Sequence, residues 1–318
     1  MDEGKILWIN GQHVSRADAT VDFIGNTFQY GFAVFEGIRA YKTDAGPAIF
    51  RLDAHIKRLM NSAKIIGLDV PYSQDEIMDA CCEMVEVNGY EECYIRPVVY
   101  IASGGMGLDY RGCEVSVGIA TWFWGEYLGK GKLEEGSHVM TSSFTRHHIN
   151  SNMSKAKASG NYMLFQMART DALRKGFDEA LLLDANGHVA EGSVENVFIV
   201  QNSELITPPL TYILDGITRN TIIQLARDNG WVVREEFFTR DSVYIADEMF
   251  FVGTGAEVTP VVSLDHRPIG DGKPGPVTRQ LQKLYFDAVR GRDSRYSHWL
   301  SYTRPEATGR SSQTLKVG

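Results

Sequence analysis

The chain has 318 residues, of which 43% are hydrophobic and 23% charged, so it carries enough apolar material for a folded core and is not globally disordered. Acidic residues outnumber basic ones by 40 to 32, and the net charge of −8 argues against binding to nucleic acid or to an anionic membrane surface. No apolar stretch approaches the roughly 20 residues that a membrane-spanning helix needs. At about 150 residues per domain the length predicts two domains, with a single large domain as the alternative.

The amino terminus reads MDEGKILWING, an acidic start without the long apolar region of a signal peptide, so a cytoplasmic location is expected. Four cysteines are too few for a disulfide framework in a chain of this length. Zinc-type C-x-x-C spacing does not occur, and the adjacent His147 and His148 suit neither one face of a helix nor one face of a strand. We therefore expect no metal site.

The first part of the sequence predicts a small α/β unit that opens with a hairpin. Asn10 and Gly11, a strong hairpin-turn signal, separate two short strand-like runs. A helix is expected over 53–66 with Asp53 as its N-cap, and a second helix begins at Ser73, where Glu76 completes a capping box. Further strand-like runs are found at 33–41, 48–52, 92–102 and 114–124.

The composition changes at 125–137, which is rich in glycine and charge. We place an interdomain linker at 128–136, so that residues 1–127 form a small N-terminal domain and residues 137–302 a larger domain with a mainly β core and surrounding helices. A polar tail follows at 303–318. In the larger domain we expect helices at 161–175, 218–229 and 277–290, and a strand pair near 232–238 and 248–253. Two mixed α/β halves place a ligand cleft at their junction.

The segment KAKASGNY (155–162) carries two lysines next to small residues, just before a predicted helix. A lysine on a confined segment can form a Schiff base if desolvation lowers its pKa. The ordinary alternative is a solvated pair of surface lysines. The spacing alone does not distinguish Lys155 from Lys157.

Two glycine-containing turns are candidate anion sites. In ILDGITRNTII, a strand end passes through Asp215-Gly216 into a helix at Thr218, whose backbone N–H groups could hold a phosphate. In GTGA, at 253–256, the turn exposes several N–H groups that could also hold an anion. An ordinary Thr N-cap and a plain tight turn are the structural alternatives.

Three other side chains are candidates for a cleft. Glu191 ends a predicted strand with Gly192 and Ser193 behind it, so its carboxylate could point into the cleft or lie on the surface. Tyr30 and Phe35 belong to the aromatic run YGFAVFEGIRAY, where they either line an apolar pocket or pack within a sheet.

Taken together, the ordered motifs YGxxVFEGIRxY, HxxRL, YIRPxxY, GMG, AKAxGNY, EGxxENxF, LDGITR and GTGAEVTP resemble those of the fold-type IV enzymes that depend on pyridoxal phosphate. Within that group the sequence is most similar to the branched-chain amino-acid aminotransferases, over about residues 5–300. The resemblance implies a two-domain α/β fold, pyridoxal 5'-phosphate as cofactor, and small-molecule amino acids and 2-oxo acids as partners.

The resemblance implies that Lys157 is the lysine that binds the cofactor covalently, because it stands five residues before Tyr162, as the family pattern requires. The resemblance implies a cofactor site made of Arg58, Lys157, Tyr162, Glu191, Ile217, Thr218 and Thr254. It implies a substrate site made of Tyr30, Phe35, Tyr94, Arg96, Leu108, Trp124, Tyr127, Gly255 and Ala256. Tyr30 and Leu108 would come from a neighbouring subunit, so a homodimer at least is expected, with a hexamer as a larger alternative.

The implied reaction is a ping-pong transfer of the amino group of L-leucine, L-isoleucine or L-valine to 2-oxoglutarate. A D-amino-acid transaminase, an (R)-amine transaminase and an aminodeoxychorismate lyase are alternatives of the same fold type, and a non-catalytic ligand-binding module is a further one. The segment RHHINSNMSKAKASGNY departs from the proline-containing version that many relatives carry. This segment adjoins the predicted active site, so the side-chain preference there is the least determined part of the prediction.

Overall fold

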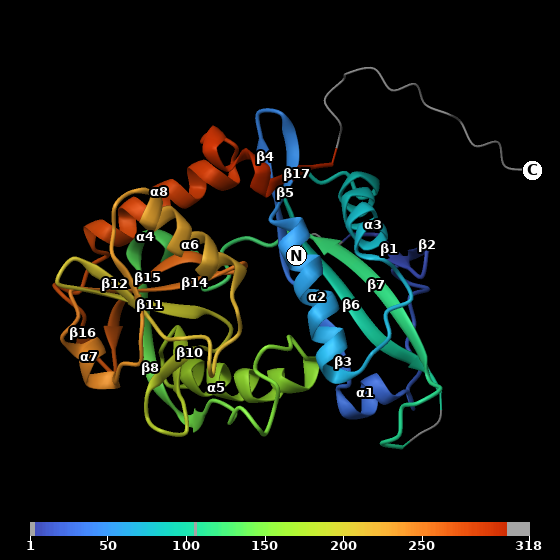
Figure 1. Ribbon diagram of the computed structural model, residues 1–318, viewed down its shortest axis with the longest axis horizontal. Helices are drawn as coiled ribbons and strands as arrows, with labels where there is room; N and C mark the ends of the chain where they lie inside the picture. The colour runs from blue at the N-terminus through green and yellow to red at the C-terminus, as the bar shows by residue number, and fades with distance from the viewer. Residues whose placement is uncertain (1–3, 105–106, 304–318) are drawn as a thin grey trace, which may run out of the picture.

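The computed structural model describes residues 4–104 and 107–303, which form two β-sheets with helices packed around each (Figure 1). The first sheet and its helices lie on the right of Figure 1, and the second lies on the left. The mixed α/β fold class predicted from the sequence is confirmed. The division into domains at 128–136 remains a proposal, and the structure adds a four-residue helix, α4 (Lys132–Glu135), inside that segment.

The first sheet has the strand order β17-β5-β4-β6-β7-β1-β2, with β3 also paired to β6. Its strands are β1 (Ile6–Ile9), β2 (Gln12–Ser15), β3 (Ala33–Phe35), β4 (Ile38–Thr43), β5 (Gly46–Phe50), β6 (Cys93–Ser103), β7 (Glu114–Trp122) and β17 (Leu300–Tyr302). Its helices are α1 (Asn26–Tyr30), α2 (Leu52–Ile66) and α3 (Gln74–Val87). The buried residues of α2 and α3 pack with the apolar side chains of the sheet in one core.

The predicted turns and caps of this part are largely confirmed. Asn10 and Gly11 have positive φ angles of 47° and 83°, as a tight hairpin turn requires, and β1 pairs with β2. The capping box of Ser73 and Glu76 is present at the start of α3. The predicted N-cap of α2 is wrong, because Arg51 holds that position in the left-handed conformation, which places Asp53 in the first turn.

The strand-like run 33–41 is interrupted in the structure. β3 ends at Phe35 and β4 begins at Ile38, and both pair with β6, opposite Val98–Tyr100 and Cys93–Ile95. The interruption leaves Glu36 and Gly37 outside the ladder. Glu36 is fully buried, and its carboxylate contacts His55 and Arg58 of α2 rather than a strand neighbour.

The second sheet has the order β10-β9-β8-β15-β14-β11-β12-β13, with β16 paired to β15. Its strands are β8 (Ser137–Thr145), β9 (Glu179–Leu183), β10 (Val189–Gly192), β11 (Asn196–Gln201), β12 (Glu204–Thr207), β13 (Val233–Glu235), β14 (Glu248–Gly253), β15 (Glu257–Leu264) and β16 (Arg267–Pro268). Around it lie α5 (Tyr162–Arg174), α6 (Ile217–Asp228), α7 (Arg240–Tyr244) and α8 (Pro276–Val289), and the 3-10 turns η1 (Ser159–Asn161) and η2 (Ser294–Trp299).

One pairing in this sheet differs from the prediction. The runs near 232–238 and 248–253 do not pair with each other: β13 pairs in parallel with β12, and β14 pairs with β11 and β15. The helix α6 connects β12 to β13, so this unit is a parallel crossover rather than a hairpin.

The two sheets share part of their core. Tyr41, Ala48 and Phe50 of the first sheet pack with Phe198 and Phe250 of the second, together with α6 and α8. After α8 the chain returns to the first sheet, where β17 pairs with the edge strand β5 through Leu300 opposite Phe50. These contacts fix the two sheets against each other around the site described below.

Among the helices of the described residues, none combines the length and apolar character needed to cross a membrane. No cluster of metal-ligating side chains occurs within 4–104 and 107–303. All four cysteines are free. Of the predicted tail, Thr303 is buried and its backbone N–H bonds the Pro47 carbonyl at 3.2 Å, while 304–318 lie outside the described residues. Two residues of the GMG motif, at 105 and 106, also lie outside them.

Candidate active site

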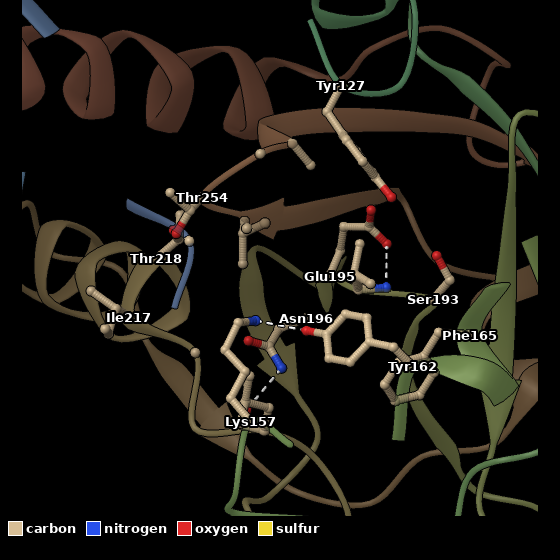
Figure 2. Close-up of a pocket in the computed structure, with 18 of the residues that line it drawn as sticks. Tyr127, Lys157, Tyr162, Phe165, Ser193, Glu195, Asn196, Ile217, Thr218 and Thr254 are labelled. Atoms are coloured by element: carbon tan, nitrogen blue, oxygen red, sulfur yellow. Dashed lines mark hydrogen bonds between the residues drawn. The ribbon is translucent and has the colours of Figure 1, made fainter. Parts of the chain in front are cut away.

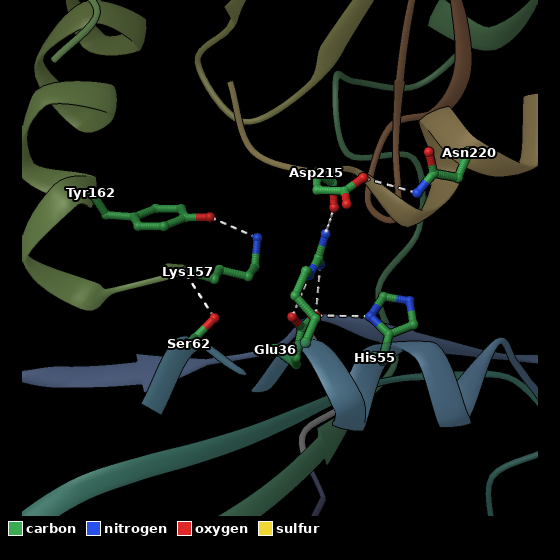
Figure 3. A network of polar contacts seen from close by, with 9 residues as sticks. Glu36, His55, Ser62, Lys157, Tyr162, Asp215 and Asn220 are labelled. Atoms are coloured by element: carbon green, nitrogen blue, oxygen red, sulfur yellow. Dashed lines mark hydrogen bonds and ion pairs between the residues drawn. The ribbon is translucent and has the colours of Figure 1, made fainter. Parts of the chain in front are cut away.

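Lys157 lies at the centre of a pocket between the two sheets. Its Nζ lies 2.7 Å from the hydroxyl oxygen of Tyr162 (Figures 2 and 3). Its backbone is fixed from the first sheet: its N–H bonds Ser62 Oγ at 3.0 Å, and its carbonyl accepts from Phe35 N–H at 3.1 Å. The side chain of Lys155 instead is exposed and bonds the Leu210 carbonyl. The backbone geometry thus places only one lysine of the pair in the pocket.

Burial and, to a smaller extent, the positive charge of Arg58 lower the pKa of the Lys157 amine to about 8. At neutral pH a sizeable fraction of this amine is therefore unprotonated and nucleophilic, unlike that of a surface lysine. Burial raises the pKa of Tyr162, so its hydroxyl is a neutral donor and acceptor beside the amine. The ring of Tyr162 packs between Phe35 at 4.7 Å and Phe165 at 5.2 Å, measured between centroids.

A cradle for an anion lies at another wall of the pocket. The helix α6 begins at Ile217 after the N-cap Gly216, which offers no side chain to cap the first N–H groups. Figure 2 shows the side chains of Thr218 and Thr254 together at this end, and both line the pocket with Arg58. Helix N–H groups, hydroxyls and a guanidinium are the donors that bind a phosphate dianion.

Arg58 is held by a buried network that the sequence analysis missed (Figure 3). Its Nε and Nη2 donate to the two oxygens of Glu36 at 2.6 and 2.8 Å, and its Nη1 donates to the Asp215 carbonyl at 2.7 Å. His55 Nδ1 lies 2.8 Å from the same carboxylate. Burial alone would raise the pKa of Glu36, but Arg58 and His55 outweigh it and hold that pKa well below its usual range. The available signal was the presence of charged residues, Glu36 among them, inside a mainly apolar strand-like run.

Glu191 is buried at β10 and lines a smaller cavity that adjoins the main pocket and shares Lys157 and Tyr162 with it. One carboxylate oxygen lies 2.5 Å from Arg146 Nε, and the other accepts from Leu214 N–H at 3.3 Å. The predicted surface alternative for Glu191 is therefore wrong. Arg146 was not singled out in the sequence, where it stands in the segment RHHINSN.

The remaining wall of the pocket is aromatic and polar. The predicted substrate residues that line it are Phe35, Tyr94, Arg96, Trp124, Tyr127, Gly255 and Ala256. Trp124 packs edge-on to Tyr94 at 4.7 Å and to Tyr127 at 5.3 Å. A Cβ atom at Gly37 would lie 1.8 Å from the Tyr94 hydroxyl oxygen, so the close approach of Tyr94 requires glycine there.

The turn that carries Gly255 is anchored from the first sheet by Arg39. Its guanidinium donates to the carbonyls of Thr254 at 3.0 Å, Gly255 at 3.2 Å and Gly125 at 2.9 Å. These bonds direct the carbonyls of the turn away from the pocket, toward β4. Arg39 is another functional position that the sequence analysis did not identify.

Tyr30 and Leu108 are not among the residues that line the pocket of this chain. These two residues are 45% and 85% exposed, and Val21, Phe23, Ile24 and Phe28, which precede Tyr30 in the chain, are exposed as well. All the other predicted site residues line one of two adjoining cavities, which share Lys157 and Tyr162. Tyr30 and Leu108 were predicted to come from a neighbouring subunit.

These residues fit pyridoxal 5'-phosphate. The free amine of Lys157 suits an aldehyde, and the cradle of Arg58, Thr218 and Thr254 suits a phosphate. The buried carboxylate of Glu191 suits a protonated ring nitrogen. The site is therefore that of an enzyme which uses a covalently held aldehyde cofactor to rearrange bonds of an amine.

The family comparison agrees with this chemistry. The model for amino-transferase class IV matches residues 33–264, more than half of the chain, and the protein belongs to that family.

The relatives are close in sequence and in structure. The chain is 49% identical to the branched-chain-amino-acid aminotransferase of Pseudomonas aeruginosa over 94% of this chain and 97% of that protein. The crystal structure of the Escherichia coli branched-chain amino acid aminotransferase superposes with a TM-score of 0.93 at 40% identity, covering 95% of this chain and 100% of that one. The enzyme of the same name from Thermobaculum terrenum, in its holo-form with pyridoxal phosphate, gives a TM-score of 0.88 at 36% identity, covering 95% of this chain and 99% of that one.

Proposed function

We propose that the protein is a pyridoxal-phosphate-dependent aminotransferase that transfers the amino group of L-leucine, L-isoleucine or L-valine to 2-oxoglutarate. The observation that carries this proposal is the buried Lys157 amine, 2.7 Å from Tyr162 OH and with a pKa of about 8. The names of the relatives support the substrate class. None of the three relatives described above is a D-amino-acid transaminase, an (R)-amine transaminase or a lyase, so those alternatives gain no support.

When bound, the cofactor supplies an electron sink for the carbanion formed at the substrate α-carbon. Arg58, Thr218 and the first N–H groups of α6 would bind its phosphate, and Lys157 would hold it covalently. Glu191, paired with Arg146, would favour a proton on the ring nitrogen. Lys157, once released, is the free amine that accepts the α-proton and returns it as general base and acid. Tyr162 OH holds the Nζ end of Lys157 in place for that transfer.

The pocket wall has both kinds of surface that the two half reactions need. Phe35, Trp124 and Tyr127 offer an apolar face to a branched side chain. Arg96 lines the same pocket, its Cζ 4.5 Å from the Phe35 ring, and its buried Nε has no hydrogen-bond partner among the described residues. That free donor supports binding of the distal carboxylate of glutamate or 2-oxoglutarate in the second half reaction.

A homodimer at least is part of the proposal. Tyr30 and Leu108 are exposed although both are largely apolar, and they do not line the pocket of this chain. We propose that these two residues close the pocket of a second copy. A cytoplasmic location is likewise proposed, and the four free cysteines fit a reducing compartment.

The decisive experiment compares Lys157→Ala with the matched control Lys155→Ala. Borohydride reduction of the cofactor-loaded protein, followed by peptide mapping, is expected to find the pyridoxyl adduct on Lys157. Lys157→Ala should form no adduct, and its transaminase turnover should fall by about four orders of magnitude or more. Lys155→Ala should keep both, because its side chain lies outside the pocket.

The substrate class is tested with the wild-type protein and a panel of amino donors with 2-oxoglutarate as acceptor. L-leucine, L-isoleucine and L-valine should give parallel-line ping-pong kinetics. Faster turnover of D-alanine or (R)-1-phenylethylamine would contradict the proposed substrate class while leaving the role of Lys157 intact.

A further inference from the structure

A second buried charged cluster adjoins the pocket and has no part in the chemistry above. It is centred on Arg169, which follows Tyr162 and Phe165 along one face of α5, so that all three line the pocket. Arg169 Nη1 lies 3.4 Å from Glu179 Oε2, and Arg169 Nη2 donates to the Tyr127 carbonyl at 3.3 Å. The guanidinium therefore connects helix α5, strand β9 and the segment between the two sheets.

Arg169 also stacks on a wall of the pocket. Its Cζ lies 4.1 Å from the centroid of the Tyr127 ring, close enough for a cation–π contact. A Cβ atom at Gly255 would lie 3.4 to 3.5 Å from Tyr127, so the other side of Tyr127 packs on the backbone of the 253–256 turn. Tyr127 is thus held between a guanidinium and the turn, and its position depends on both.

The charge of Arg169 is shared by two buried carboxylates. Glu179 is fully buried, and Glu195 is 1% exposed and lines the pocket. Glu195 Oε2 accepts from Val194 N–H at 3.1 Å, whereas its Oε1 is buried and has no hydrogen-bond partner among the described residues. Figure 2 shows the hydroxyl end of Tyr127 directed toward Glu195 and Ser193. Removing Arg169 would leave the buried Glu179 without its ion-pair partner, at the cost that buried unpaired charges carry.

Direct binding of a substrate carboxylate is the competing role for an arginine in a pocket wall. The contacts of Arg169 argue against it. Its two terminal nitrogens are directed to Glu179 and to a backbone carbonyl, and its flat face is covered by Tyr127. Arg169 Nη1, like Arg96 Nε, has no hydrogen-bond partner among the described residues, but Nη1 forms an ion pair with Glu179 and the guanidinium contacts Tyr127.

We propose that Arg169 is a positioning residue: its charge compensates the buried Glu179, and its stacking holds Tyr127 against the Gly255 turn, which sets the fit of the pocket to the substrate side chain. The effect on substrate fit rests on the proposed function, whereas the charge compensation does not. A neutral Glu195 is consistent with this arrangement, because burial and repulsion from Glu179 raise the pKa of its carboxyl well above its ordinary value.

The test uses the cofactor-loaded wild type and four variants: Arg169→Met, Arg169→Lys, Glu179→Gln and the double variant Arg169→Met/Glu179→Gln. Thermal unfolding reports charge compensation, and KM for L-leucine against kcat reports the fit of the pocket. Bound-cofactor absorbance verifies that each protein is loaded. Arg169→Met is expected to lower the melting temperature. It is also expected to raise KM by about tenfold, which corresponds to the interaction energy typical of two side chains in contact.

The double variant should recover most of the melting temperature, because one carboxylate charge has gone with the arginine, but it should keep the raised KM. Arg169→Lys should likewise keep the melting temperature and lose fit, because an ammonium keeps the charge without the planar stacking of a guanidinium. Glu179→Gln alone should retain a KM within about twofold of wild type, since Arg169 and Tyr127 stay in contact.

Two outcomes overturn the proposal. A double variant no more stable than Arg169→Met, including failure of both to fold, would show that charge compensation is not what Arg169 provides. A raised KM for 2-oxoglutarate alone, with unchanged melting temperature in Arg169→Met, would show direct carboxylate binding instead. If no branched-chain donor is turned over by the wild type, the proposed function fails, and the melting temperatures still decide the charge compensation.

Discussion

Glu36 and Glu195 are both buried glutamates near one pocket, yet their carboxyls differ in protonation. Both oxygens of Glu36 are bound by Arg58, and His55 adds a third contact, so the carboxylate is fully compensated and stays ionised. Glu195 shares one arginine with Glu179 and has an oxygen without a partner, so burial raises its pKa. Burial alone does not decide the state of a carboxyl; the number of donors supplied per negative charge does.

The largest effect is expected at the fully compensated cluster. Glu36→Ala leaves the Arg58 guanidinium buried without its counter-ion and should lower the free energy of unfolding by about 3–5 kcal/mol. It should also weaken cofactor retention, because Arg58 loses its fixed orientation. Urea unfolding and the dissociation rate of the cofactor on dilution measure the two effects. Glu36→Gln, which keeps the shape and one acceptor, serves as control and should fall between Glu36→Ala and wild type.

The second prediction concerns Lys157, whose pKa depends on the charges of that cluster. The rate at which Lys157 captures the cofactor should change by about tenfold per pH unit below its pKa. Because the pKa of the Lys157 amine is about 8, capture of pyridoxal phosphate by the cofactor-free protein should speed up about tenfold from pH 6 to 7 and level off above pH 8. Stopped-flow absorbance measures the rate. Glu36→Gln should move the midpoint downward, since the charge of Glu36 raises the pKa of Lys157. A midpoint near that of an exposed lysine would contradict this account.

A third, smaller effect is expected at Glu195, where substitution should raise the stability of the protein rather than lower it. The pKa of Glu195 is raised in the folded state, so the folded protein holds a proton that the unfolded chain releases above about pH 4.5. Stability from this group therefore falls as the pH rises, until Glu195 itself ionises. Glu195→Gln removes this penalty and should be more stable than wild type by about 1 kcal/mol at pH 9, with a smaller difference at pH 6. A variant less stable than wild type at both pH values would show that the carboxylate is compensated after all.

The smallest effect is expected at His55. Burial lowers the pKa of His55, so at pH 7 it is a neutral donor to a carboxylate that keeps both bonds from Arg58. His55→Gln should cost about 0.5–1.5 kcal/mol, as for one hydrogen bond. Urea unfolding at pH 7 and at pH 8 should give the same loss of stability, because the His55 ring is neutral in the folded protein at both pH values. A loss as large as that of Glu36→Ala would mean that the histidine, rather than the arginine, compensates Glu36.

Local signals in the sequence predicted what local physics determines. The hairpin at Asn10 and the capping box at Ser73 are set by neighbouring residues, and both are present in the structure. The motif around Lys157 located the reactive lysine only through its resemblance to a family, since the spacing left Lys155 equally possible. The structure separates the two lysines through the contact of the Lys157 backbone with Ser62, a residue 95 positions earlier in the chain.

The parts that the sequence did not predict depend on contacts between distant segments. The interruption at Glu36 follows from its pairing with Arg58, and the parallel pairing of β13 with β12 follows from the crossover through α6. Arg39, Arg146 and Arg169 look like ordinary surface arginines in the sequence, and only the fold shows that they contact carbonyls or carboxylates inside it. Buried charged residues were therefore the main omission, because their partners lie far away along the chain.

The return of the chain to the first sheet has a consequence for biosynthesis. Strand β5 stays an open edge until Leu300–Tyr302 have left the ribosome, so the first sheet is finished only when almost the whole chain has been made. A nascent or truncated chain that ends before this strand would expose β5 to pairing with other chains. Truncation at residue 290 should therefore yield insoluble protein, whereas loss of residues 304–318 leaves this strand in place.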